Sequence, residues 1–142
     1  MSGAGCSSST RRAPAAKYVV EPLDESLTER LLRLHNLARW EHYKKPLEIT
    51  PALNAYAATF AQSMASSRRM DHSPMSFRRW CGYAWAAENI AAYQPSVEDV
   101  MRGWMNSAGH RANILNPRLR FAGFGMARDA SGQPYWIAVF GG

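Results

Sequence analysis

The sequence predicts an α+β domain in which helices lie on both sides of a small, mainly antiparallel sheet. Two observations support this prediction. Three segments begin with helix-capping residues and continue with apolar residues at helical spacing, and the C-terminal segment alternates in the manner of paired strands. A chain of 142 residues with 46% hydrophobic content has room for one domain with a real core.

The first two helices are predicted from their N-terminal caps. Residues 26–29, Ser-Leu-Thr-Glu, have the form of a capping box. Thr50 is a cap residue, and Pro51 follows it at the first helical position, where proline is favoured. His35 lies beside the apolar stripe of the first helix, so we interpret it as a packing or hydrogen-bonding residue rather than a metal ligand.

The third helix is predicted to begin at Ser96, because Glu98 and Asp99 are well placed in its positively polarised first turn. Gly109 suits the left-handed residue that ends a helix. On this interpretation His110 lies just past the end of the helix, where the chain reverses.

The C-terminal part is predicted to be a β-hairpin. Residues 121–128 and 135–140 alternate as strands, and residues 129–133 (Asp-Ala-Ser-Gly-Gln) join them. Residues 88–92 are predicted to form a further strand. Residues 75–87 are expected to be irregular, with their aromatic side chains capping the core.

The basic residues are scattered, which argues against a nucleic-acid reader. The net charge is +6, from 17 Lys and Arg against 11 Asp and Glu. The pairs at 11–12, 44–45, 68–69 and 78–79 fall in the tail and loops instead of gathering on one element with aromatic platforms. We therefore interpret them as solvated loop charge and expect no nucleic-acid partner.

Residues 1–20 are predicted to be a disordered tail and residues 21–142 the folded domain, because the tail contains almost nothing apolar to bury. Only two cysteines occur, Cys6 and Cys81, which excludes a disulfide framework; two separate thiols are favoured over one bridge. The segment ending at Cys6 looks like the end of a bacterial lipoprotein signal, which would anchor the protein to a membrane. The alternative is a cysteine without a role in a polar tail.

Three short motifs carry the side chains best suited to chemistry. His72 lies in Asp-His-Ser-Pro, Glu88 in Ala-Ala-Glu-Asn-Ile-Ala, and His110 in Gly-His-Arg-Ala-Asn-Ile-Leu. Two imidazoles and a carboxylate are often used to bind a divalent metal or to transfer protons.

In their order, these motifs resemble the CAP superfamily of cysteine-rich secretory proteins, antigen 5 and pathogenesis-related class 1 proteins, and most closely its bacterial SCP-like branch. The resemblance runs over roughly residues 26 to 140. It includes residues 35–39 (His-Asn-Leu-Ala-Arg) and residues 135–140 (Tyr-Trp-Ile-Ala-Val-Phe). It implies a three-layer α-β-α sandwich.

The resemblance also implies a cleft in which two histidines and two acidic residues face one another. Here the histidines are His72 and His110, and the first acid is Glu88. The second acid falls on Ser107, which departs from the family pattern. The implied ligand cleft is therefore formed by His72, Glu88, Ser107 and His110. The implied metal ligands are His72, His110 and Glu88, with zinc or another divalent cation as the cofactor.

Several functions remain open. The resemblance implies a binding module of the cell envelope or exterior that can hold a divalent metal or a small apolar or lipid ligand. We expect the protein to be monomeric and extracellular, periplasmic or lipid-anchored through Cys6. One alternative is a metal-dependent hydrolase with His72, Glu88 and His110 as catalytic residues. Another is a protein–protein interaction module in which Glu88 accepts hydrogen bonds from both histidines and the cleft is inert. A Ser107–His110–Glu88 nucleophilic arrangement is a further alternative.

Overall fold

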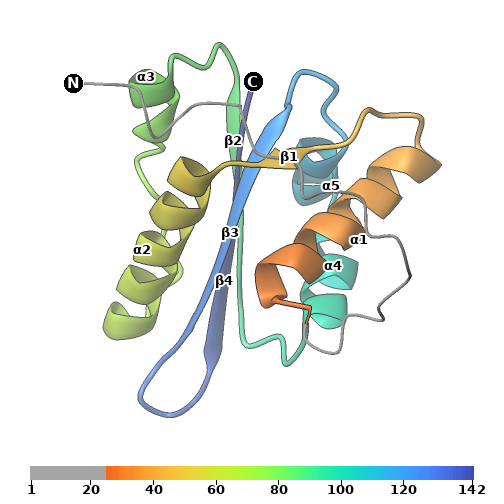
Figure 1. Ribbon diagram of the computed structural model, residues 1–142. Helices are drawn as coiled ribbons and strands as arrows, with labels where there is room; N and C mark the ends of the chain where they lie inside the picture. The colour runs from red at the N-terminus through yellow and green to blue at the C-terminus, as the bar shows by residue number, and fades with distance from the viewer. Residues whose placement is uncertain (1–24) are drawn as a thin grey trace, which may run out of the picture.

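A four-stranded mixed sheet forms the middle layer of the computed structural model, which describes residues 25–142 (Figure 1). The strand order is β1-β3-β4-β2, with β4 antiparallel to both of its neighbours and β1 parallel to β3. The strands are β1 (Glu48–Ile49), β2 (Ala86–Ala92), β3 (Phe121–Arg128) and β4 (Pro134–Gly141). The predicted hairpin and the predicted strand at 88–92 are confirmed, whereas β1 was not predicted.

Helices cover both faces of this sheet (Figure 1). On one side lie α2 (Pro51–Ser67) and α3 (Phe77–Cys81). On the other side lie α1 (Leu27–Glu41), α4 (Val97–Met105) and α5 (Ala108–Ile114). The α+β class and the three-layer α-β-α sandwich are therefore confirmed.

Strand β4 is the centre of both hydrophobic cores, and all eight of its residues are buried. Trp136, Ala138 and Phe140 point into the core beneath α1, α4 and α5. The alternate residues of the strand, Tyr135, Ile137 and Val139, belong to the core beneath α2. Because side chains alternate across a strand, one central strand supplies both layers.

The predicted helix starts are confirmed by their side-chain caps. Ser26 accepts from the Glu29 amide at 3.1 Å, and Glu29 accepts in turn from the Ser26 amide, which completes the capping box. Thr50 caps α2 by accepting from Leu53 N at 3.1 Å, and Ser96 caps α4 in the same way. Local side-chain chemistry therefore sets all three starts.

The predicted end of the third helix is wrong. Helix α4 ends at Met105, and the extended backbone of Ser107 (φ −112°, ψ 121°) begins a separate helix, α5. Gly109 lies inside α5 and is absent from the positive-φ glycines of the described residues. His110 is therefore carried on a helix rather than just past the end of one.

The segment 75–87 is more ordered than expected, because it contains the short helix α3. Phe77 is buried in the core, as the capping interpretation requires. Trp80 and Trp85, however, are 56% and 47% exposed, so they do not cap the core. Phe77 is the one buried residue of α3, which leaves Trp80 on its exposed side, and Trp85 lies beyond the helix.

Cys81 is disulfide-bonded, which corrects the expectation of separate thiols. The other cysteine in the sequence, Cys6, lies outside the described residues, as do the predicted tail (1–20) and the lipid-anchor hypothesis. Across residues 25–142, none of the helices combines the length and the apolar character that a membrane span requires.

His35 is a packing residue, as predicted. Its ring is fully buried and lies 4.7 Å from Phe124 and 5.7 Å from Phe140, centroid to centroid. Its Nδ1 lies 2.6 Å from the carbonyl of Leu31, whereas Nε2 has no hydrogen-bond partner among the described residues. Burial lowers the pKa of His35 from 6.5 to about 4, because a charged imidazole is poorly solvated there.

We predict that His35→Phe flattens the loss of stability in acid. The unfolded chain takes up a proton at this histidine near pH 6.5, but the folded chain does so only near pH 4. Stability from this group is therefore complete above pH 6.5 and falls as the pH drops toward 4, by about 3 kcal/mol in total. Urea unfolding at pH 7 and pH 4 measures the difference. His42→Phe, at the residue that follows α1, is the control. If the His35→Phe variant loses as much stability between pH 7 and pH 4 as the wild-type protein does, the assignment is refuted.

Candidate functional site

Glu88 is buried on β2 and accepts three hydrogen bonds from the loop before α3. Its Oε1 accepts from His72 Nδ1 and from the Ser73 amide, each at 2.8 Å. Its Oε2 accepts a short hydrogen bond from the Ser73 hydroxyl. Since β2 is paired along its whole length with β4, this carboxylate is held on a rigid strand and positions the loop.

Two residues that sequence reasoning missed complete this network. The Tyr56 hydroxyl, from α2, donates to Ser73 Oγ at 2.8 Å, and it accepts from the Ser76 amide at 3.2 Å. Ser73 directly follows His72 in the Asp-His-Ser motif, so its position was visible in the sequence. Tyr56 gave no such signal, because nothing local distinguishes it from the apolar residues of α2.

His110 is oriented by its own helix. Its Nδ1 lies 2.9 Å from the Ser107 hydroxyl, three residues earlier in the chain. Helix α5 is tied to β2 by Asn89, which is fully buried and donates to the His110 carbonyl at 3.0 Å. Asn113 donates to Asn89 Oδ1 at 2.8 Å. These amide contacts, which the sequence did not predict, hold His110 against the strand that carries Glu88.

The charge of His72 acts on His110. Burial lowers the pKa of His110, and the nearby charge of His72 lowers this pKa further. His72 itself is open to solvent, with 62% of its side chain exposed. The site therefore favours a neutral imidazole at His110, which is the form that binds metal ions.

The four predicted cleft residues fall into two hydrogen-bonded pairs. Glu88 bonds to His72 and Ser107 bonds to His110, whereas the described structure contains no hydrogen bond between Glu88 and His110. Ser107 thus occupies the expected position of the second acid and orients the second histidine. Asp71 interacts with Arg69 at 3.4 Å instead of with this site.

A small pocket of about 240 Å³ adjoins His110. Ser107 and His110 form its polar side, together with Gln94. The remaining walls are mainly apolar: Met70, Ile90, Ala91, Ala92, Gly103 and Trp104. The site therefore offers imidazole chemistry beside an apolar surface.

The donor set fits a cation only in part. Within residues 25–142, no three His, Cys, Asp or Glu side chains gather in an arrangement that could hold a metal ion. Glu88 already accepts three hydrogen bonds and so suits the role of orienting His72. The atoms suited to ligation are Nε2 of His72 and Nε2 of His110, because the Nδ1 atoms are engaged with Glu88 and Ser107.

We predict that Glu88→Ala lowers the free energy of unfolding by about 1–3 kcal/mol, because the Ser73 amide and hydroxyl lose their buried acceptor. Denaturant unfolding at pH 7 measures this change. The matched control is Glu41→Ala, at the exposed end of α1, which should change stability by less than about 0.5 kcal/mol. Equal effects of the two substitutions would contradict the buried network.

A three-layer sandwich with paired polar contacts around two histidines defines the class of this protein. The chain belongs to the CAP (cysteine-rich secretory protein) family, whose sequence model matches residues 32–140. It is 36% identical over 111 residues to the uncharacterized protein YkwD of Bacillus subtilis (strain 168). That match covers 72% of this chain and 43% of YkwD, so this chain spans less than half of that relative.

Solved structures show the same fold. An outer surface protein of Borrelia burgdorferi superimposes with a TM-score of 0.70 at 19% identity, covering 78% of this chain and 88% of that one. An extracellular SCP-domain protein of Bacillus anthracis str. Ames superimposes with a TM-score of 0.68 at 25% identity, and the match covers 80% of this chain and 39% of that one. NaASP2, solved with Zn²⁺, superimposes with a TM-score of 0.63 at 13% identity, and the match covers 80% of this chain and 77% of NaASP2. The resemblance to the bacterial branch of the family is thereby confirmed.

Proposed function

We propose that this chain is a binding module of the cell exterior or envelope whose His72–His110 site takes up a divalent cation such as zinc. The observation that carries the proposal is the hydrogen bonding of the two histidine rings. Each engages Nδ1 in an orienting hydrogen bond, at 2.8 Å to Glu88 and at 2.9 Å to Ser107, so Nε2 is the nitrogen suited to a ligand.

Two further facts support this proposal. The lowered pKa of His110 keeps its ring neutral near pH 7, so a cation would not have to displace a proton there. Among proteins of the same fold, NaASP2 was solved with Zn²⁺, and the Borrelia burgdorferi and Bacillus anthracis proteins are described as outer-surface and extracellular, respectively. A bound zinc ion would supply a Lewis acid beside the apolar pocket at His110.

The same geometry favours binding over hydrolysis. Glu88 is the carboxylate that is hydrogen-bonded to His72, and both of its oxygens already accept hydrogen bonds. A general base must be within reach of the proton that it removes. Glu88 therefore serves to orient His72, and the apolar walls at Met70 and Trp104 suit a small ligand held beside the cation.

Zinc titration by calorimetry, with melting temperature as a second readout, tests the proposal. Zinc should bind the folded protein and raise its melting temperature by mass action, and binding should weaken below about pH 6 as free imidazoles protonate. The double change His72→Ala and His110→Ala should abolish binding, whereas His42→Ala should not. Ser107→Glu should tighten binding.

Two outcomes would overturn the proposal. If the intact protein does not bind zinc, the two histidines serve only in structural pairs. If zinc binding survives the double alanine change, the cation lies at another site.

A further inference from the structure

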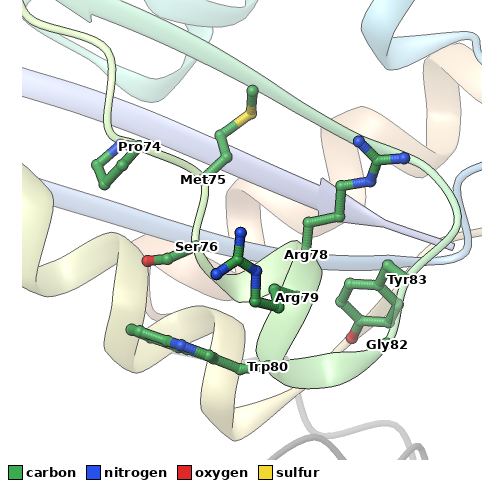
Figure 2. Close-up of a pocket in the computed structure, with 8 residues that line it drawn as sticks. All are labelled: Pro74, Met75, Ser76, Arg78, Arg79, Trp80, Gly82 and Tyr83. Carbon is green, nitrogen blue, oxygen red and sulfur yellow. The ribbon is translucent and has the colours of Figure 1, made fainter.

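A pocket of about 640 Å³ lies at α3 and contains neither histidine of the site described above (Figure 2). It is formed by the loop from Pro74 and by α3 with the turn that follows it. Two adjacent arginines, Arg78 and Arg79, line it, and none of its described lining residues is acidic. In Figure 2 both arginine side chains rise from α3 on the side of Met75.

The positive charge of this pocket is left uncompensated by the described residues. The guanidinium of Arg79 makes no hydrogen bond and no ion pair with any of them, and the residue is exposed. Within residues 25–142, the guanidinium of Arg78 donates one hydrogen bond, from Nη2 to the Ala84 carbonyl at 2.9 Å. Two adjacent guanidinium groups with free donors are well suited to a phosphate or carboxylate, which they can bind through several parallel hydrogen bonds.

A second, apolar pocket of about 360 Å³ adjoins the basic one, between α2 and α3. The two pockets share Ser76 and Trp80. The walls of the second pocket are mostly apolar, from Ala52, Ala55 and Phe60 on α2 and Phe77 on α3. Trp80, 56% exposed, borders both pockets, and an exposed indole beside an apolar groove is a typical ligand contact.

The walls of the two pockets are held in place. Residues with positive φ stand on either side of α3, at Met75 (49°) and at Gly82 (70°). The turn after the helix is closed by a hydrogen bond from Tyr83 N to the Arg78 carbonyl at 2.9 Å. The Ser76 amide donates to Tyr56, and Cys81 is disulfide-bonded. A preorganised site loses less entropy when a ligand binds.

We propose that the two pockets together bind an anionic amphiphile. Its phosphate or carboxylate head would contact Arg78 and Arg79, and its apolar chain would pass Trp80 and lie along α2 against Ala55 and Phe60. A simple anion would leave the apolar pocket unfilled, and a neutral apolar molecule would leave the two guanidinium groups unpaired. This site contains none of His72, Glu88, Ser107 and His110, so the two proposals stand or fall separately.

Calorimetry on the full chain without reductant, with three probes, tests this inference. Decyl phosphate, used below its micelle concentration, carries both the anionic head and the apolar chain. Inorganic phosphate carries only the head. Decyl maltoside carries the same chain on a neutral head. Decyl phosphate should bind at least about tenfold more tightly than either of the others, because only it fills both pockets. Vesicles of phosphatidylglycerol test the same head group in a bilayer.

Substitutions separate the two parts of the site. Arg79→Gln should weaken decyl phosphate about tenfold and leave decyl maltoside unchanged, because it removes the charged donors and leaves an uncharged polar side chain. Ala55→Leu should weaken decyl phosphate but not inorganic phosphate. Arg102→Gln, an exposed arginine on α4, is the matched control, and circular dichroism melts establish that each variant is folded.

Three results would overturn the inference. The first is equal affinity for decyl phosphate and decyl maltoside. The second is equal weakening by Arg79→Gln and Arg102→Gln, which would indicate general charge attraction. The third is binding to vesicles without binding to monomeric decyl phosphate, which would indicate a membrane surface instead of a pocket for one molecule.

Discussion

Replacing Arg39 with methionine should lower the free energy of unfolding by about 3 kcal/mol or more. The Arg39 side chain is buried on α1, with 1% of the residue exposed, and its guanidinium donates only to backbone carbonyls. The acceptors are Lys45 O at 2.6 Å, Ile114 O at 2.8 Å, Asn116 O at 3.0 Å and Leu119 O at 3.1 Å. Hydrogen bonds from a charged donor contribute about 1.5–3 kcal/mol each, and their loss leaves carbonyls without a partner.

Urea unfolding at pH 7 measures the effect of Arg39→Met. Arg33→Met is the matched control, because Arg33 lies on the same helix, is 57% exposed and pairs with Glu25 at 3.0 Å. The control should change stability by less than about 1 kcal/mol. Arg39→Lys should fall between the two, since one ammonium cannot reach all four carbonyls. A methionine variant as stable as the control would refute this role for Arg39.

Replacing Gly123 with alanine should destabilise the protein by about 3 kcal/mol or more. A Cβ at Gly123 would lie 2.1 Å from the carbonyl carbon of Leu53 and 2.3 Å from its oxygen. A Cβ at Gly125, two residues later on the same face of β3, would likewise meet the backbone at Ala57. Helix α2 therefore lies directly on the strand, and the obstacle is backbone, which cannot rotate away as a side chain can.

Gly109→Ala is the control for this substitution. No atom lies within 4 Å of a Cβ built there, and the residue is inside α5. Alanine at this position should stabilise the protein by about 0.5–1 kcal/mol, because glycine costs more conformational entropy in a helix. Melting temperatures should thus move in opposite directions for the two glycine variants. A Gly123→Ala protein as stable as wild type would show that α2 can shift away from β3.

Most of the fold could be predicted from local signals in the chain. The caps at Ser26, Thr50 and Ser96 depend on side chains that bond to amides three residues away, so the sequence specifies them directly. The alternation of residues 121–128 and 135–140 likewise specified the hairpin. The break at Ser107 was missed, because a Gly two residues later was the stronger helix-ending signal by composition alone.

The sequence singled out four residues of the candidate site but did not show how they pair. Family-like motifs singled out His72, Glu88, Ser107 and His110. Which histidine meets Glu88 depends on the loop from Asp71 to Ser76 and on the register of β2 against β4. Tyr56 joined the network only because α2 packs beside that loop.

By itself, the sequence determined where α1, α2 and α4 begin, the hairpin of β3 and β4, the two-sided character of the sheet, and the family, because caps, periodicity and motifs are encoded within a few residues of each other. Only the tertiary structure decided which carbonyls Arg39 satisfies, why Gly123 must lack a side chain, and how the basic pocket at Arg79 meets an apolar one. These features join segments that are far apart in the chain. Their energies come from burial and close approach, and neither exists until the layers have packed.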